Sequence, residues 1–349
     1  MASPSSRTEL ITYAKRQLGE PVLQVNVDDE QVNNVIDDTF QFFQENCYNG
    51  MERCYLVHEI TADDKTRLAA TTDTTKVDAG VTVDMDGNTI GVTGATDING
   101  ILTVGGSTLT LDGASVVDGT ITVVAGTVDA NGTVNATGGN LTFTGAGSLE
   151  LAGNVTSLGV LTDATHGTVT YDGGSQNLFG PQTYVNLVAG GTGTKTLLGT
   201  VTVSGAFTSN ASVTTAMGAF DLDVAGATDI NGIVTMTTGT LDTEGTFDAT
   251  GGTIDINDAG ELQLAATTPL LGTNLSTDFG KVTYDGTAQT IFADTYYSLT
   301  AGGGSGTKTL GGNVTVENDL TIDTDVTISM DIHDLTVTDT TDIDGTLAV

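Results

Sequence analysis

The chain has 349 residues and a formal net charge of −34, from 44 acidic and 10 basic residues. So acidic a composition excludes a protein that binds DNA or RNA phosphates and one that docks on anionic lipid, because both need a basic face. Two cysteines are too few for a disulfide scaffold or a four-thiolate zinc site.

The first residues of the chain are polar. Residues 1–17 include Arg7, Lys15 and Arg16 and are followed by no apolar segment, so this start lacks a secretory signal. No run of 18 or more apolar residues occurs anywhere in the sequence, which predicts no membrane insertion. We therefore expect a protein that is made and used without export.

Glycine and charge divide the sequence near residue 76. Residues 1–76 contain 7 of the 10 basic residues and 2 of the 46 glycines, and residues 77–349 contain the remaining 3 and 44. We predict a small helical (α+β) attachment domain over 1–61, a polar linker over 62–76 and a repeat array over 77–349.

A first helix is predicted after Ser6. Ser6 and Glu9, three residues later, have the spacing of a capping box, in which each side chain binds the backbone N–H of the other residue. Leu10, Ala14 and Leu18 follow at helical spacing, and Gly19 ends the pattern. The apolar residues of 22–27 predict a short extended segment.

A second helix is predicted from Asp28, with Gln31 at the matching capping position. Asn49-Gly50 ends it, and residues 55–60 alternate as in a strand. About 60 residues with so narrow a core are marginally stable alone, so this segment should pack against a partner or against copies of itself. The second apolar stripe consists of Val32, Val35, Ile36, Phe40, Phe43 and Cys47. The candidate attachment residues are Leu10, Leu18, Val32, Ile36, Phe40, Phe43 and Tyr55.

Five short runs in this domain resemble a known family. They are Ser6–Leu10, Leu18–Val22, Val25–Val32, Ile36–Asp38 and Glu52–Leu56. Together they resemble the opening of neck and other virion structural proteins of contractile-tailed phages, above all phages of marine cyanobacteria. The resemblance covers residues 6–61 and implies binding to phage neck, connector or tail proteins in a virion that assembles in the host cytoplasm. After Thr61 a repeat array takes the place of the rest of such a protein.

The array has a long period of 113 residues. Val169–Gly173 returns as Val282–Gly286, and Gly193–Leu197 returns as Gly306–Leu310. Without gaps, 19 of the 35 positions of 169–203 are identical to their counterparts in 282–316. A shorter period of about 19 residues lies inside the long one, so about six short units should make one long repeat.

The short unit has the pattern of one coil of a solenoid. Alternating Thr and Val predict half-buried strands, and Gly, Asn and Asp between them predict tight corners. We predict a mainly β, right-handed parallel β-solenoid with about 19 residues in each of about 14 coils. Disorder and an array of antiparallel sandwiches are the alternatives. The chain ends partway through a long repeat, so we expect either that it is a fragment of a longer protein or that its last coil meets a partner or a symmetry mate.

The sequence predicts no catalytic, cofactor-binding or metal-binding residues and no enzymatic activity. The Asp-rich turns at 84–88 and 342–345 lack the spacing of an EF-hand, which leaves only weak binding of Ca²⁺ open. His58, His166 and His333 show no metal-ligand spacing. Five tyrosines recur with the long repeat: Tyr171, Tyr184, Tyr284, Tyr296 and Tyr297. We expect them to stack inside the coils rather than to form an exposed receptor-binding ladder.

These observations predict a phage virion structural protein. It would be a fibre- or whisker-like appendage on the neck or tail, a homo-oligomer, with contacts to a glycan or protein of the host surface. One alternative is a bacterial surface adhesin with β-helix repeats, against which the missing export signal argues. Another is a polysaccharide-degrading tailspike, which would release reducing sugar from host glycan.

Overall fold

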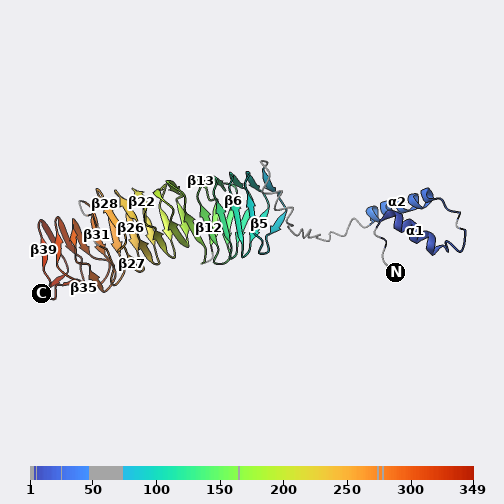
Figure 1. Cartoon of the computed structure of the whole chain (residues 1–349). Coiled ribbons are helices and arrows are strands. Elements are labelled where there is room, and N and C mark those ends of the chain that lie inside the picture. The colour runs from blue at the N-terminus through green and yellow to red at the C-terminus, as the bar shows by residue number, and fades with distance from the viewer. Residues whose placement is uncertain are drawn as a thin grey trace. The chain divides into compact units, whose positions relative to one another are not determined.

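The computed structural model describes residues 4, 6–24, 26–46, 74–163, 166–272, 275–276 and 279–349. The chain divides into two compact units, Met1–Glu59 and Ile60–Val349. We call them the helical unit and the solenoid unit and describe each by itself (Figure 1).

The helical unit contains α1 (Arg7–Gln17) and α2 (Asp29–Asn46). One of the two bonds of each predicted capping box is present at the start of each helix. The Ser6 hydroxyl accepts a hydrogen bond from the Glu9 backbone N–H at 3.2 Å, and the Gln31 side chain accepts one from the Asp28 N–H at 3.3 Å. Both bonds satisfy backbone donors that the first turn of a helix leaves without partners.

The segment between the two helices differs from the expectation. Residues 18–22 form turns, and the described part of 22–27 contains no strand, so the predicted extended segment is wrong. Gly19, at a φ of 107°, reverses the chain at the end of α1. The backbone N–H groups of Val22 and Leu23 donate hydrogen bonds to the Gly19 carbonyl oxygen, and these bonds hold both residues in the turn. Val25, Cys47, Asn49, Gly50, Cys54, Tyr55, His58 and the predicted strand at 55–60 lie outside the described residues.

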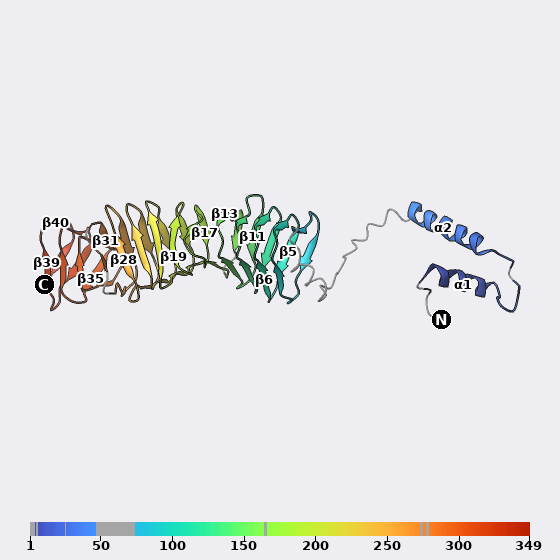
Figure 2. The same ribbon diagram turned by 45° about the horizontal axis from the view of Figure 1, so that its top comes forward.

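The solenoid unit is a parallel β-solenoid of about 13 turns with about 20 residues in each turn. Each turn supplies one strand to each of three faces, and strands of successive turns lie side by side along the unit (Figure 2). This confirms the predicted fold class and rules out both the disordered and the antiparallel alternative. The right-handed winding stays a prediction.

The first face carries a five-stranded, a six-stranded and a three-stranded sheet in succession. Its strands are β1 (Thr75–Val77), β4 (Thr96–Ile98), β7 (Ser115–Val117), β10 (Val134–Asn135), β13 (Val155–Ser157), β16 (Gln176–Leu178), β19 (Gly193–Leu197), β22 (Val213–Gly218), β25 (Ile233–Met236), β28 (Thr253–Ile256), β30 (Leu275–Ser276), β33 (Thr295–Tyr296), β36 (Val314–Val316) and β39 (Leu335–Val337).

The second face carries a five-stranded and then a nine-stranded sheet. Its strands are β2 (Thr82–Asp84), β5 (Ile101–Val104), β8 (Thr120–Val123), β11 (Asn140–Phe143), β14 (Val160–Asp163), β17 (Gln182–Tyr184), β20 (Val201–Val203), β23 (Leu222–Val224), β26 (Thr240–Thr243), β29 (Glu261–Leu264), β31 (Lys281–Tyr284), β34 (Ser298–Ala301), β37 (Asp319–Ile322) and β40 (Thr340–Ile343).

The third face carries a nine-stranded and then a four-stranded sheet. Its strands are β3 (Ile90–Val92), β6 (Thr108–Leu111), β9 (Thr127–Ala130), β12 (Ser148–Leu151), β15 (Thr168–Tyr171), β18 (Asn186–Ala189), β21 (Phe207–Ser209), β24 (Thr228–Ile230), β27 (Phe247–Asp248), β32 (Gln289–Ile291), β35 (Gly306–Leu310), β38 (Val326–Ser329) and β41 (Thr346–Ala348). Between β27 and β32, Leu270 forms an isolated parallel bridge with Asp248.

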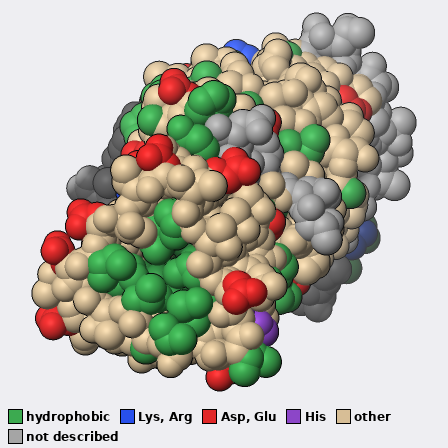
Figure 3. Space-filling view, turned by 90° about the vertical axis from the view of Figure 1, so that its left-hand side faces the viewer, with side chains coloured by type: hydrophobic (Ala, Val, Ile, Leu, Met, Phe, Trp, Pro, Cys, Tyr) green, Lys and Arg blue, Asp and Glu red, His purple; other side chains and the backbone are tan. Residues whose placement is uncertain are grey.

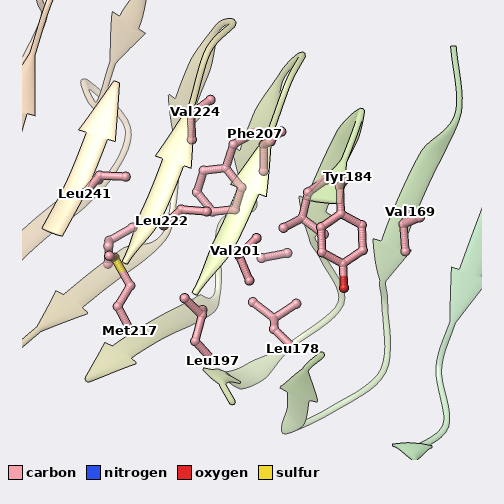
Figure 4. Packing of buried hydrophobic residues seen from close by; sticks show 14 of the residues in the cluster. Val169, Leu178, Tyr184, Leu197, Val201, Phe207, Met217, Leu222, Val224 and Leu241 are labelled. Atoms are coloured by element: carbon pink, nitrogen blue, oxygen red, sulfur yellow. The ribbon is translucent and has the colours of Figure 1, made fainter. Parts of the chain in front are cut away.

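The apolar core runs through the interior of the solenoid. In β6, Leu109 and Leu111 are buried and Thr108 and Thr110 are half-buried, as expected for a strand with alternating sides. The same alternation recurs from turn to turn, so equivalent apolar side chains stack in columns. Figure 4 shows such packing around Phe207 and Leu222, which point into the same interior.

The long repeat does not equal a whole number of turns. Paired residues on neighbouring strands are 19 positions apart at Thr96 and Ser115, and 21 apart at Leu299 and Leu320. At about 20 residues per turn, 113 residues make about five and two-thirds turns, rather than the six short units expected. Consequently β15 lies on the third face, and its repeat counterpart β31 lies on the second.

Candidate functional site

Polar contacts join the two helices of the helical unit. The Arg7 guanidinium donates to the Asn33 side chain at 2.7 Å and forms an ion pair with Asp37, also at 2.7 Å. Lys15, near the end of α1, pairs with Asp29 at the start of α2. Hydrogen bonding to Asp29 raises the pKa of Lys15. Exposed ion pairs contribute little to folding stability. We therefore infer that the two helices need contact with the surface of another protein or domain to be stable.

The predicted attachment residues do not form one buried core. No residue of α1 is buried, and Leu10, Val32 and Ile36 are only half-buried. Leu18 is 58% exposed and Phe40 is 56% exposed. The side chain of Phe43 and the whole of Tyr55 lie outside the described part of the structure.

The structure adds exposed apolar residues that the sequence pattern did not select. Phe42 is 67% exposed, Leu23 is 62% exposed and Val22 is 90% exposed. The helical stripe omitted Phe42 because it lies between the positions that face one side, although its place beside Phe40 and Phe43 was a usable signal. Several large exposed apolar side chains on so small a unit make its surface a candidate for binding another protein.

Two buried lysines lie inside the solenoid, each paired in register with a glutamine one turn earlier. Lys195 pairs with Gln176, and Lys308 pairs with Gln289. The Lys195 ammonium donates to the Gln176 carbonyl oxygen at 2.7 Å and to the Gly173 oxygen at 2.8 Å. Burial lowers the pKa of both lysines. The negative charge of Asp172 partly offsets this lowering at Lys195, and that of Asp285 does so at Lys308.

These clusters are structural elements rather than chemical sites. The Gln176 amide continues the chain of bonds by donating to the carbonyls of Leu151 and Gly153 in the preceding turn, at 2.6 and 2.9 Å. Gln289 does the same at Leu264 and Ala266. The sequence pattern did not predict these buried clusters. Both copies of the long repeat do contain a Gln and a Lys 19 residues apart, and this spacing was a usable signal.

Four of the five repeated tyrosines are buried, as predicted. The hydroxyls of Tyr171 and Tyr184 lie 3.1 Å apart, and those of Tyr284 and Tyr296 lie 2.8 Å apart. Burial raises the pKa of Tyr171 to about 12. The prediction is wrong for Tyr297, which is half-buried at the surface with its ring 5.8 Å from that of Phe279.

A groove of about 360 Å³ lies beside Tyr297 on the second face of the solenoid. Residues that precede β29 and residues in or just before the neighbouring strands β31, β34 and β37 line it. The lining residues are Asp258, Ala259, Gly280, Lys281, Tyr297, Ser298, Thr300, Asp319 and Thr321.

Outward carboxylates lie in register on neighbouring strands. Asp223 pairs with Asp242 on the second face, and Asp129 pairs with Glu150 on the third. Burial, then repulsion from Glu244 and other carboxylates, raises the pKa of Asp242 to about 6. The pKa values of the other three are raised as well, with burial as the main cause.

These raised pKa values predict a solenoid that is more stable at pH 5 than at pH 8. The folded state favours the protonated carboxyl, so stability is lost as pH rises from the unfolded value of about 3.9 through the folded value. After solvent screening we expect about 1 kcal/mol, or a Tm about 2–4 °C higher at pH 5. Calorimetry at the two pH values measures this. Asp242→Asn should reduce the difference, and a Tm that falls at pH 5 would contradict the assignment.

The described residues contain no group of three or more His, Cys, Asp or Glu side chains that could hold a metal ion. Among those residues we also find no helix with the length and apolar character of a membrane span. At the C-terminal end of the solenoid, Figure 3 shows apolar side chains between carboxylates. Exposed apolar residues of the last turn are Ile332, Ile343, Leu347 and Val349.

Comparison with protein families assigns the chain. The family model of the bacteriophage T4 neck protein gp13 matches residues 1–291. The chain belongs to this neck protein family. No curated protein matches the chain, and no solved structure does.

Membership in the neck protein family extends the resemblance seen in the sequence. That resemblance ended at residue 61, whereas the family match continues through most of the solenoid to residue 291. The chain is therefore a virion structural protein, associated with neck or tail components of a phage. The family is a structural one, in agreement with the absence of a predicted catalytic site.

Proposed function

We propose that this neck-family protein is a fibre- or whisker-like appendage of the phage neck or tail. The helical unit would bind neck, connector or tail proteins, and the solenoid unit would form the projecting body. The observation that carries the proposal is the contrast in burial between the units. The solenoid has a continuous core, while no residue of α1 is buried and Phe40 and Phe42 on α2 are exposed.

The proposed mechanism of the solenoid is mechanical. Parallel strands of successive turns are joined by backbone hydrogen bonds, and buried columns of apolar side chains reinforce them. Each turn contacts its neighbours along the unit, so stability accumulates with the number of turns. The strong negative charge of the chain opposes association between solenoids and favours solubility. Several copies held at the virion by their helical units would then project separately.

Contact with the host surface, through a glycan or a protein, is the second part of the proposal. Membership of the neck protein family favours a virion over a bacterial cell surface as the location, and so argues against the adhesin alternative.

Replacing Phe40 and Phe42 by serine together should reduce incorporation of the protein into virions at least about tenfold. Both side chains are exposed, and serine has nearly the helix propensity of phenylalanine, so the helices should form as before. Quantitative immunoblots of purified virions from a complemented deletion phage measure the incorporation.

The matched control replaces two exposed apolar residues of the solenoid, Leu198→Ser with Phe220→Ser. These changes should leave incorporation within about twofold, because surface substitutions away from an interface have small effects. If the control loses incorporation and the helical variant keeps it, the solenoid and not the helical unit would be the attachment surface.

A further inference from the structure

The groove beside Tyr297 combines an aromatic wall with a floor of hydroxyl groups. Lys281 lies in register with Ser298 on the next strand, and Thr300 lies in register with Thr321. Asp319 begins the strand that contains Thr321. The strands are about 4.8 Å apart, so the groove offers regularly spaced polar groups along the solenoid. The tilted pair of Phe279 and Tyr297 adds an apolar face beside them. Phe279 is 53% exposed.

The charges of the groove oppose an anionic ligand. The Lys281 ammonium is paired with the Glu261 carboxylate at 3.0 Å, and Glu261 also accepts a hydrogen bond from the Thr283 hydroxyl at 2.7 Å. These bonds lower the pKa of Glu261 against the opposing effect of burial, so the carboxylate stays ionised beside the lysine. Asp258 and Asp319 add two further acidic side chains to the lining.

The other copy of the long repeat shows which groove residues the fold does not require. The buried Tyr184 corresponds to Tyr296, since each bonds the preceding buried tyrosine, and not to Tyr297 as the ungapped repeat indicates. Lys281 pairs with Ser298 as Thr168 pairs with Asn186, so Tyr297 occupies the place of Val185. The same register gives four further correspondences. They are His166 with Phe279, Thr168 with Lys281, Val188 with Thr300, and Ala206 with Asp319.

The comparison separates the core from the groove. The core residues Gln176 and Lys195 recur unchanged as Gln289 and Lys308. Several groove positions differ between the copies, with Val185, Thr168 and Ala206 in the places of Tyr297, Lys281 and Asp319. Others recur unchanged, such as Gly167 as Gly280 and Thr208 as Thr321. A valine at the position of Tyr297 supports the same coil elsewhere, so the tyrosine is available for a role other than folding.

We infer that this groove binds a neutral saccharide. Sugar rings present apolar C–H faces that stack on aromatic side chains and hydroxyls that exchange hydrogen bonds with Ser, Thr and carboxylate groups. The volume of about 360 Å³ lies in the range of small-molecule sites and accommodates a short segment of a glycan rather than a folded partner. The inference rests on the host-contact part of the proposed function and names its ligand class.

The test uses the full chain and a panel of neutral oligosaccharides from dextran, mannan and laminarin, with anionic alginate oligosaccharides for contrast. Calorimetric titration should detect binding of at least one neutral oligosaccharide and weaker or absent binding of alginate. Tyr297→Val should weaken that binding at least tenfold, and Tyr297→Phe should retain most of it because the ring remains. Phe220→Ser, which removes an exposed aromatic residue outside the groove lining, should leave the affinity unchanged.

Two results would overturn the inference. One is a wild-type chain that binds no neutral oligosaccharide of the panel or prefers alginate. The other is binding that Tyr297→Val does not change while its thermal unfolding matches that of the wild type. Virions that carry the protein in either case would leave the proposed appendage intact. Saccharide binding by a protein that is missing from virions would instead support the groove and contradict the appendage.

Discussion

Replacing Lys195 by methionine should lower the free energy of unfolding by about 1–3 kcal/mol. Methionine has a similar length but cannot donate hydrogen bonds. The oxygens of Gly173, Gly174 and Gln176, which now accept from the lysine at 2.8, 2.5 and 2.7 Å, would lose a buried donor. The Gln176 side chain is buried, so its oxygen would carry the full cost of desolvation, whereas the oxygens of the half-buried Gly173 and the exposed Gly174 can bind water instead.

Hydrogen exchange in the turns around residues 173–197 is the appropriate measurement, because it reports the stability of the turns that lose the lysine. The matched control is Lys281→Met on the surface of the same unit. Lys281 forms an ion pair with Glu261 that is partly exposed, so its loss should cost less than about 1 kcal/mol. Equal effects of the two changes would contradict the structural role of the buried lysine.

Replacing Gly132 by alanine should destabilise the solenoid by about 2–3 kcal/mol, since the new methyl group overfills a closed corner. A Cβ atom at this position would lie 2.0 Å from the Gly113 carbonyl oxygen of the preceding turn. A Cβ atom built on Gly153, one turn later, would lie 2.0 Å from the Gly132 oxygen, so backbone lies on both sides of this corner. The backbone of one turn would have to move and stretch the hydrogen bonds to its neighbours.

Thermal unfolding and hydrogen exchange of Gly132→Ala should be compared with those of Gly106→Ala. Nothing lies within 4 Å of a Cβ atom built on Gly106. Alanine there should be neutral or stabilise by about 0.4–1 kcal/mol, because it restricts the unfolded chain. A Gly106 variant that loses as much stability as the Gly132 variant would show that glycine flexibility, rather than close packing between turns, decides these corners.

The sequence predicted the parts of the fold that depend on local pattern. Leu109 and Leu111 alternate with threonines, and this alternation alone identifies a strand with one buried side. Ser6 and Gln31 were identified as caps because their partners lie three residues away along the chain. The extended segment after Pro21 was wrong, because the turn around Gly19 overrode the preference of Val22 and Leu23 for strands.

The features that the sequence did not predict depend on the exact number of residues in each turn. A difference of one residue moves a side chain from the interior to the surface, so an ungapped repeat placed Tyr297 where Tyr296 lies. The same counting puts β15 and β31 on different faces. Burial of Lys195 was not expected, because a lysine is rarely buried, and two of its three acceptors are backbone carbonyls that no residue type reveals.

The most direct test of the proposed appendage is immunogold electron microscopy of purified virions, with antibody raised against residues 77–349. For the proposed appendage we expect label at the neck or tail, some distance from the point of attachment if the solenoid projects. Virions without label, prepared from cultures in which the host cells are labelled, would contradict it and would favour a protein of the bacterial surface.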